Sequence, residues 1–142
     1  MNLTFRQQEN ALTLQDLNDF ETLIGLVLPQ DYKEHMIAHN GGIVNESVGH
    51  TNYPEGGEGI SKFYPIKYGT YKIEEISSNL KGKIPKGYLI IGITNNAAKI
   101  IMSLNNDSTY GNIKEYFPDG EMLDLSTSFT ELLNNMIELD EE

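Results

Sequence analysis

Two apolar segments separated by a short polar turn constrain the fold of this chain more than any other feature. Residues 88–93 read Tyr-Leu-Ile-Ile-Gly-Ile, and residues 98–104 read Ala-Lys-Ile-Ile-Met-Ser-Leu. Such β-branched, apolar runs favour strands that are buried on both faces. Asn95 and Asn96 between them are typical of a hairpin turn. The sequence therefore predicts an antiparallel hairpin at the centre of a sheet.

Two helices are predicted in the N-terminal part of the chain. Thr13 can cap the first, whose apolar residues recur at helical spacing until Gly25. The second begins near Pro29, which presets the φ angle of a first helical turn. It is predicted to end at Asn-Gly-Gly, residues 40–42, because Asn and Gly tolerate the left-handed conformation that closes a helix. Residues 43–59 are rich in Gly, Asn and Glu, which predicts a long exposed loop containing a short strand near its start.

The remaining segments complete an α+β pattern. Residues 63–66 predict a strand or edge segment, and residues 71–80 predict a short amphipathic helix. Residues 112–117 predict a third strand of the meander, followed by a turn at residues 118–120. A capping box then opens a helix with an apolar stripe over residues 128–137. We expect a mostly antiparallel central sheet of about four to six strands, with two N-terminal helices and one C-terminal helix packed against it.

The length and composition indicate one cytoplasmic domain over residues 1–142. A chain of this size buries one hydrophobic core. It contains no cysteine, which excludes a disulfide framework, a thiolate metal site and a cysteine nucleophile. No apolar run approaches the roughly 18 residues that a membrane span needs, and residues 1–10 lack the pattern of a signal peptide.

The formal net charge of −11 is distributed unevenly. Residues 1–59 carry nine acidic and two basic side chains, residues 60–99 carry two and seven, and residues 100–142 carry ten and one. A negative field repels nucleic acid and anionic lipid and favours a basic protein surface, although the same charge would also serve solubility alone. We expect a protein partner with a basic surface, no nucleic acid and no membrane. The basic middle could pair with an acidic block of a second copy, so the chain is expected to be a monomer or a weak homodimer.

Two sets of side chains have features of a metal site or a catalytic site. His35 and His39 have the spacing of two zinc ligands on one helix, but Met36 stands where the zinc-protease pattern requires Glu, and no third ligand is identifiable. Glu55 and Glu58 flank two glycines in a predicted loop, which would not hold them at the fixed separation of a catalytic pair. We therefore expect no catalytic residue, no metal and no cofactor.

A series of short markers, taken in order, resembles the SUKH superfamily. They are Leu28-Pro29, Tyr32-Lys33, Asn40-Gly41-Gly42, Tyr88 to Gly92, Tyr110-Gly111-Asn112-Ile113 and Ser128-Phe129. The likeness runs from about Leu14 to Ile137 and is strongest to the branch of fungal Smi/Knr cell-wall-assembly regulators and many bacterial immunity proteins. It implies a central sheet flanked by helices, with no catalytic residue.

The resemblance implies one of two functions. Bacterial members bind and neutralise a cognate polymorphic toxin, often a nuclease, so the first expectation is an immunity protein. The alternative is a regulatory scaffold resembling the fungal regulators of glucan synthesis. For the first, acidic residues on predicted loops and turns are the expected partner contacts: Glu46, Glu55, Glu58, Asp107, Asp119 and Glu121.

Overall fold

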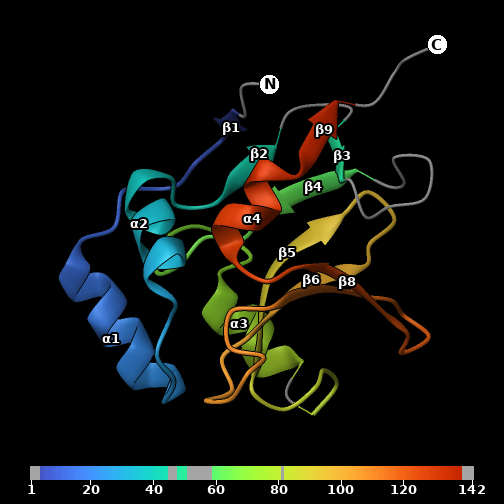
Figure 1. The fold of residues 1–142 in the computed structure, drawn as a ribbon. Helices are drawn as coiled ribbons and strands as arrows, with labels where there is room; N and C mark the ends of the chain where they lie inside the picture. Colours follow the sequence, from blue (N-terminus) through green and yellow to red (C-terminus); the bar gives the residue numbers. More distant parts are fainter. Residues whose placement is uncertain (1–3, 45–47, 51–58, 81, 139–142) are drawn as a thin grey trace.

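The computed structural model describes residues 4–44, 48–50, 59–80 and 82–138. The predicted hairpin lies at the centre of its sheet (Figure 1). The sheet has seven strands in the order β1-β2-β4-β5-β6-β7-β8, and all its neighbours are antiparallel. The strands are β1 (Phe5–Arg6), β2 (Gly42–Val44), β4 (Ile60–Phe63), β5 (Tyr88–Thr94), β6 (Lys99–Ser103), β7 (Ile113–Tyr116) and β8 (Met122–Ser126). A separate two-stranded sheet pairs β3 (Val48–His50) with β9 (Met136–Glu138).

The hairpin prediction is confirmed in detail. Strand β5 pairs with β6, and the turn falls at Asn95 and Asn96. Gly92, at a register shift in β5, allows β4 to approach closely: a Cβ atom there would stand 2.7 Å from the carbonyl oxygen of Lys62. The apolar side chains of the two strands form the middle of the core, with Ile90, Ile91, Ile100 and Ile101 all buried.

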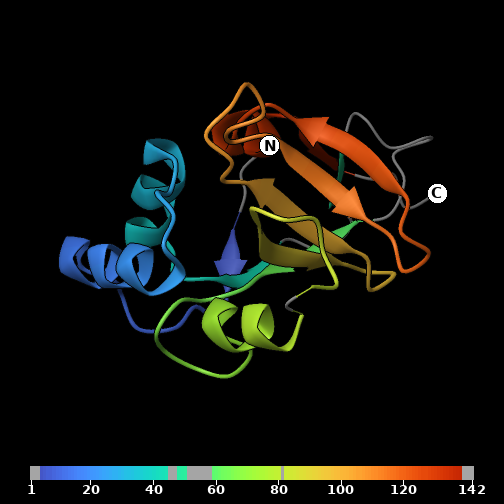
Figure 2. The ribbon, with the colours of Figure 1, turned by 90° about the horizontal axis from the view of Figure 1, so that it is seen from below.

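The four helices are α1 (Leu14–Ile24), α2 (Gln30–Ala38), α3 (Ile73–Asn79) and α4 (Phe129–Asn134). Figure 2 shows α3 and α4 on opposite sides of the sheet, with α1 and α2 together beside one end of it. As predicted, Thr13 caps α1 in a reciprocal pair with Asp16, and Gly25 ends it at a φ of 72°. None of the helices in the described ranges has the length and apolar character that a bilayer crossing requires.

Three predicted details are wrong, each because pairing over long sequence distances overrides a local signal. Four to six strands were expected, whereas β1 and β8 bring the sheet to seven. The segment 63–66 was expected to be a strand or edge segment, but β4 ends at its first residue, Phe63, and runs inside the sheet. The chain leaves the sheet before Pro65, which has no N–H to donate. The last helix ends at Asn134 instead of reaching residue 137, because Met136 begins β9 and pairs with β3.

Asn40 is not the left-handed helix stop that the sequence suggests. Helix α2 is closed by His39. In this turn the positive φ angles belong to Gly41 and Gly42, which follow Asn40. Asn40 is instead buried, with 2% of its surface exposed. Its side-chain nitrogen donates to the carbonyl oxygens of Asn10 at 2.8 Å and Ile66 at 3.0 Å, and its Oδ1 accepts from the Ile66 amide at 2.9 Å. One side chain thus joins three segments that are distant in the sequence.

Replacing Asn40 with Asp should destabilise the fold strongly. The substitution keeps the size of the side chain but points a carboxylate oxygen at two carbonyl oxygens in a buried site. We expect the free energy of unfolding in urea at pH 7 to fall by about 3 kcal/mol or more. Asn95→Asp, at the exposed hairpin turn, is the matched control and should change it by less than about 0.5 kcal/mol. Equal stability of the two variants would contradict this role of the Asn40 hydrogen bonds.

Candidate partner-binding groove

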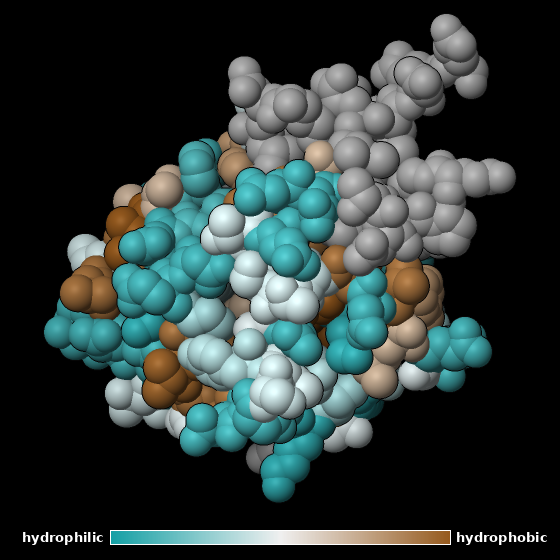
Figure 3. All heavy atoms as spheres, in the orientation of Figure 1, coloured by the Kyte–Doolittle hydropathy of each residue, from teal (hydrophilic) through white to brown (hydrophobic). Residues whose placement is uncertain are grey.

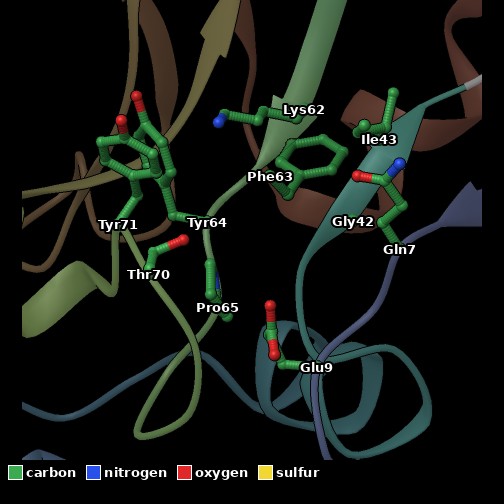
Figure 4. A pocket seen from close by; sticks show the side chains of 10 residues that line it. All are labelled: Gln7, Glu9, Gly42, Ile43, Lys62, Phe63, Tyr64, Pro65, Thr70 and Tyr71. Atoms are coloured by element: carbon green, nitrogen blue, oxygen red, sulfur yellow. The ribbon is translucent and has the colours of Figure 1, made fainter.

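A groove of about 240 Å³ lies where β4, the segment after β1 and the loop before α3 meet (Figure 4). The hydrogen bonds of Asn40 determine the geometry of this groove. The backbone oxygen of Asn40 accepts from the Glu9 amide at 3.1 Å, and its side chain holds Ile66, directly after Pro65. Gly41 allows Pro65 to pack closely, since a Cβ atom at Gly41 would stand 2.9 Å from the Pro65 nitrogen. Two walls of the groove are therefore fixed by one buried amide and one glycine.

Two tyrosines and a lysine form one wall of this groove. The Nζ atom of Lys62 lies 4.8 Å from the ring centroid of Tyr71 and 5.6 Å from that of Tyr64, within the range of cation–π attraction. Tyr64 is buried, and burial, followed by the nearby Tyr71, raises the pKa of its phenol. Tyr71 is 63% exposed. The wall therefore exposes the large side chain of Tyr71 beside a second tyrosine that is buried.

The backbone around this groove is held in an unusual conformation. Four non-glycine residues of the described chain have a left-handed φ, and three of them line the groove or lie close in sequence to it: Gln7 at 57°, Lys67 at 68° and Tyr71 at 58°. Such angles cost a non-glycine residue of order 1 kcal/mol and persist only where the surroundings enforce them. At Lys67 two contacts enforce the left-handed φ: its amide donates to Glu74, and its Nζ pairs with Asp16 at 2.6 Å.

Glu9 lies on the other side of the groove. Its side chain crosses Gly69, whose φ is 88°, and a Cβ atom at Gly69 would overlap the carboxyl group. Figure 4 shows the Glu9 carboxyl group beside Pro65, with Thr70 and Tyr71 on the other side of that residue. No pattern in the sequence marks Lys62, Tyr71 and Glu9 as a site, because they come from three segments that meet through the hydrogen bonds of Asn40.

The structure describes three of the six predicted acidic contacts, and it does not bring these three together. Asp107 is exposed in the loop before β7, where the Thr109 side chain and then its amide donate to the carboxylate and lower its pKa. Asp119 and Glu121 are exposed in the turn after β7, where Asp119 accepts from the Glu121 amide at 2.9 Å. The two groups therefore lie at opposite ends of one strand. Glu46, Glu55 and Glu58 lie outside the described residues.

The lysines of the basic middle are divided among several internal contacts. Lys67 pairs with Asp16, and Lys72 pairs with Glu75 at 3.2 Å. Lys62 lies over the tyrosines, while Lys83 and Lys86 are exposed and form no ion pair within the described ranges. The lysines that the structure describes in the middle of the chain thus form no single basic patch. Pairing with a second copy stays a prediction.

Exposed apolar side chains are scattered over the surface. In Figure 3 the face shown is mostly hydrophilic, with separate hydrophobic patches over α1 and α2; Leu14, Leu23 and Ile37 are exposed on these helices. A wider hollow of about 600 Å³ between the end of α1, α3 and the segment before β5 is lined mainly by apolar residues. The groove beside β4 has charged side chains of both signs, Glu9 and Lys62, which can orient a ligand, and this favours it as the candidate site.

His35 and His39 belong to an aromatic cluster. The ring centroid of His35 lies 4.6 Å from that of Phe129 and 5.1 Å from that of Phe5. The ring centroid of His39 lies 4.8 Å from that of Phe5. Within the described chain, no third His, Cys, Asp or Glu joins the two histidines in a group that could hold a metal. Burial, followed by the charge of His39, lowers the pKa of His35 to about 4, against a smaller opposing effect of Asp31. The cluster links α2, α4 and β1.

Acid should destabilise the fold through His35. Because the pKa of His35 is lower in the folded chain than its ordinary 6.5, the unfolded chain binds the extra proton; the stability is complete above pH 6.5 and is lost as the pH falls toward 4. We expect His35 to remove about 2 kcal/mol of unfolding free energy between pH 7.5 and 5.0. His35→Phe keeps a ring in the cluster and should reduce the drop by that amount. The free energy of unfolding in urea is measured against pH for both proteins. An equal drop in the two would show that His35 does not titrate in this way.

Comparison with known proteins adds to this geometry. The chain matches the model of the SMI1 / KNR4 family (SUKH-1) over residues 11–135, a range that contains every element from α1 to α4. It is also similar to "Uncharacterized protein YobM" of Bacillus subtilis (strain 168), with 34% identity over 88 residues. That alignment covers 62% of this chain and 45% of the relative, so the chain matches just under half of the relative's length. The SUKH resemblance is thereby confirmed, and this chain belongs to the SMI1/KNR4 family of the SUKH superfamily.

Proposed function

We propose that this protein works by binding another protein through the groove beside β4, and that it is an immunity protein whose partner is a toxin domain with a basic surface. The observation that carries the proposal is Tyr71. This large side chain is 63% exposed, yet its backbone is held at a left-handed φ beside Lys62 and a buried second tyrosine. Tyrosines are enriched among the residues that dominate binding energy in protein interfaces.

The charge and the family support the class of partner. A net charge of −11 accelerates encounter with a basic surface, and nucleases commonly carry such a surface because they bind phosphate backbones. The similar protein from Bacillus subtilis is bacterial, and the bacterial branch of the family is the one for which immunity is expected. The protein would neutralise the toxin by occupying its nucleic-acid-binding surface, which requires no catalytic group in this chain.

The regulatory alternative differs in the partner and not in the surface. A scaffold that regulates an endogenous enzyme would use the same groove, but its gene would have no toxin gene beside it. A neighbouring gene that ends in a variable toxin domain therefore favours immunity, and its absence favours regulation. Co-purification from the native host followed by mass spectrometry identifies the partner directly.

Tyr71→Ala should weaken binding to the toxin domain encoded beside this gene by about tenfold or more. Alanine retains the strain of the left-handed backbone, so the change removes the aromatic contact with little effect on the loop. Met122→Ala is the matched control, because Met122 is 47% exposed on β8, away from the groove. Affinity is measured by calorimetry, and inhibition by protection of nucleic acid from the toxin.

The control variant should bind within about twofold of the natural sequence and give full protection. Raising the salt concentration should slow association in all variants alike, because exposed charges are screened beyond about 8 Å at physiological ionic strength. Equal affinities for the Tyr71 and Met122 variants would contradict a role for the groove, and the absence of any toxin binding would refute the immunity proposal.

A further inference from the structure

The groove beside β4 contains an anionic group that the fold itself does not use. Glu9 is exposed, and no hydrogen bond or ion pair joins its carboxylate to another described residue. We infer that the groove is a receptor for one arginine side chain of the partner, which pairs with the Glu9 carboxylate and stacks on the ring of Tyr71. This inference rests on the proposed function and names the chemistry that its site recognises.

Glu9 is held in position for this role. Its backbone amide donates to the Asn40 oxygen, and its side chain lies across Gly69, in a space that exists only because residue 69 has no Cβ atom. In Figure 4 Glu9 comes from the segment after β1, while Thr70 and Tyr71 come from the opposite side of the groove. A carboxylate and an aromatic ring that line the same groove match a planar guanidinium, which forms paired hydrogen bonds and stacks on rings.

The tyrosine wall already holds a cation. Lys62 Nζ lies over both rings, at 4.8 Å and 5.6 Å from their centroids, and Lys62 forms no ion pair within the described residues. The negative faces of the rings therefore favour positive charge at this place. Lys62 occupies the position until a partner arginine displaces it. A volume of about 240 Å³ is smaller than the roughly 300 to 1,000 Å³ of drug-sized pockets and suits one long side chain.

The opposite reading is that Lys62 receives a carboxylate of the partner. Substitution of Lys62 separates the two, because they predict effects of opposite sign. Lys62→Met keeps the length of the side chain and removes the charge. If the groove receives arginine, the variant loses an internal competitor and binds a cationic probe more tightly. If Lys62 receives an anion, the variant loses its binding group.

The test is a titration of the isotope-labelled protein with the peptide acetyl-Gly-Arg-Gly-amide at constant ionic strength, followed by the backbone amide signals of Glu9, Gly69 and Thr70. The citrulline peptide, which has the same shape without the charge, and acetyl-Gly-Glu-Gly-amide are the comparison probes. We expect saturable binding of the arginine peptide only, weakened about fivefold or more by Glu9→Gln and strengthened about threefold by Lys62→Met. Glu34→Gln, at an exposed position of α2, should leave the affinity unchanged.

The inference is overturned if the citrulline peptide binds as well as the arginine peptide, if Glu9→Gln and Glu34→Gln behave alike, or if Lys62→Met weakens binding. Each variant changes an exposed or partly exposed side chain, and the amide spectrum itself reports whether the fold is intact. Failure here is distinguishable from failure of the proposed function. If Tyr71→Ala loses toxin binding but the arginine peptide does not bind, the groove is still the protein interface. Only its proposed preference for arginine is then wrong.

Discussion

The buried side chain of Asn40 is the interaction on which the rest of the site depends. Its three hydrogen bonds join residue 10, at the approach to α1, to residue 66, after β4, and its backbone oxygen holds Glu9. An amide is the one uncharged side chain of this size that can donate twice and accept at the same place. The charged alternative would carry an unpaired anion into the core, where it costs several kcal/mol. The position therefore requires asparagine for a chemical reason and not for its backbone freedom.

The groove shows how an acidic protein can present a specific site. The overall charge attracts any basic surface and does not select a partner, whereas the arrangement around Tyr71 provides shape and orientation. Acidic side chains also hold the fold: the Asp16 carboxylate accepts from the Thr13 amide at the start of α1 and binds Lys67, and Asp31 accepts from Thr130 across 99 residues of sequence. Glu9 differs from these because no hydrogen bond or ion pair joins its carboxylate to a described residue. Charge number alone would not have distinguished these roles.

Local signals in the sequence predict the elements, and long-range contacts decide the rest. The hairpin of β5 and β6 and the cap of α1 depend on neighbouring residues, so their sequence patterns are sufficient. β1 has two residues and β9 three, and both form only because a partner strand is present. β8 could have been found, since Met-Leu-Asp-Leu-Ser after the turn at residues 118–120 mixes apolar and polar residues as a half-buried strand does. The groove could not, because Glu9, Lys62 and Tyr71 lie in separate segments.

Hydrogen–deuterium exchange of the complex with the toxin domain tests the central claim, that the partner binds at the groove that Asn40 organises. Exchange of backbone amides is compared in the free and bound protein by mass spectrometry of overlapping peptides. The account predicts that binding protects residues 5–10 and 62–71 together, since these segments form the two sides of the groove. Protection restricted to the turn at residues 117–121, or to the loop at residues 105–110, with no change at the groove, would contradict it.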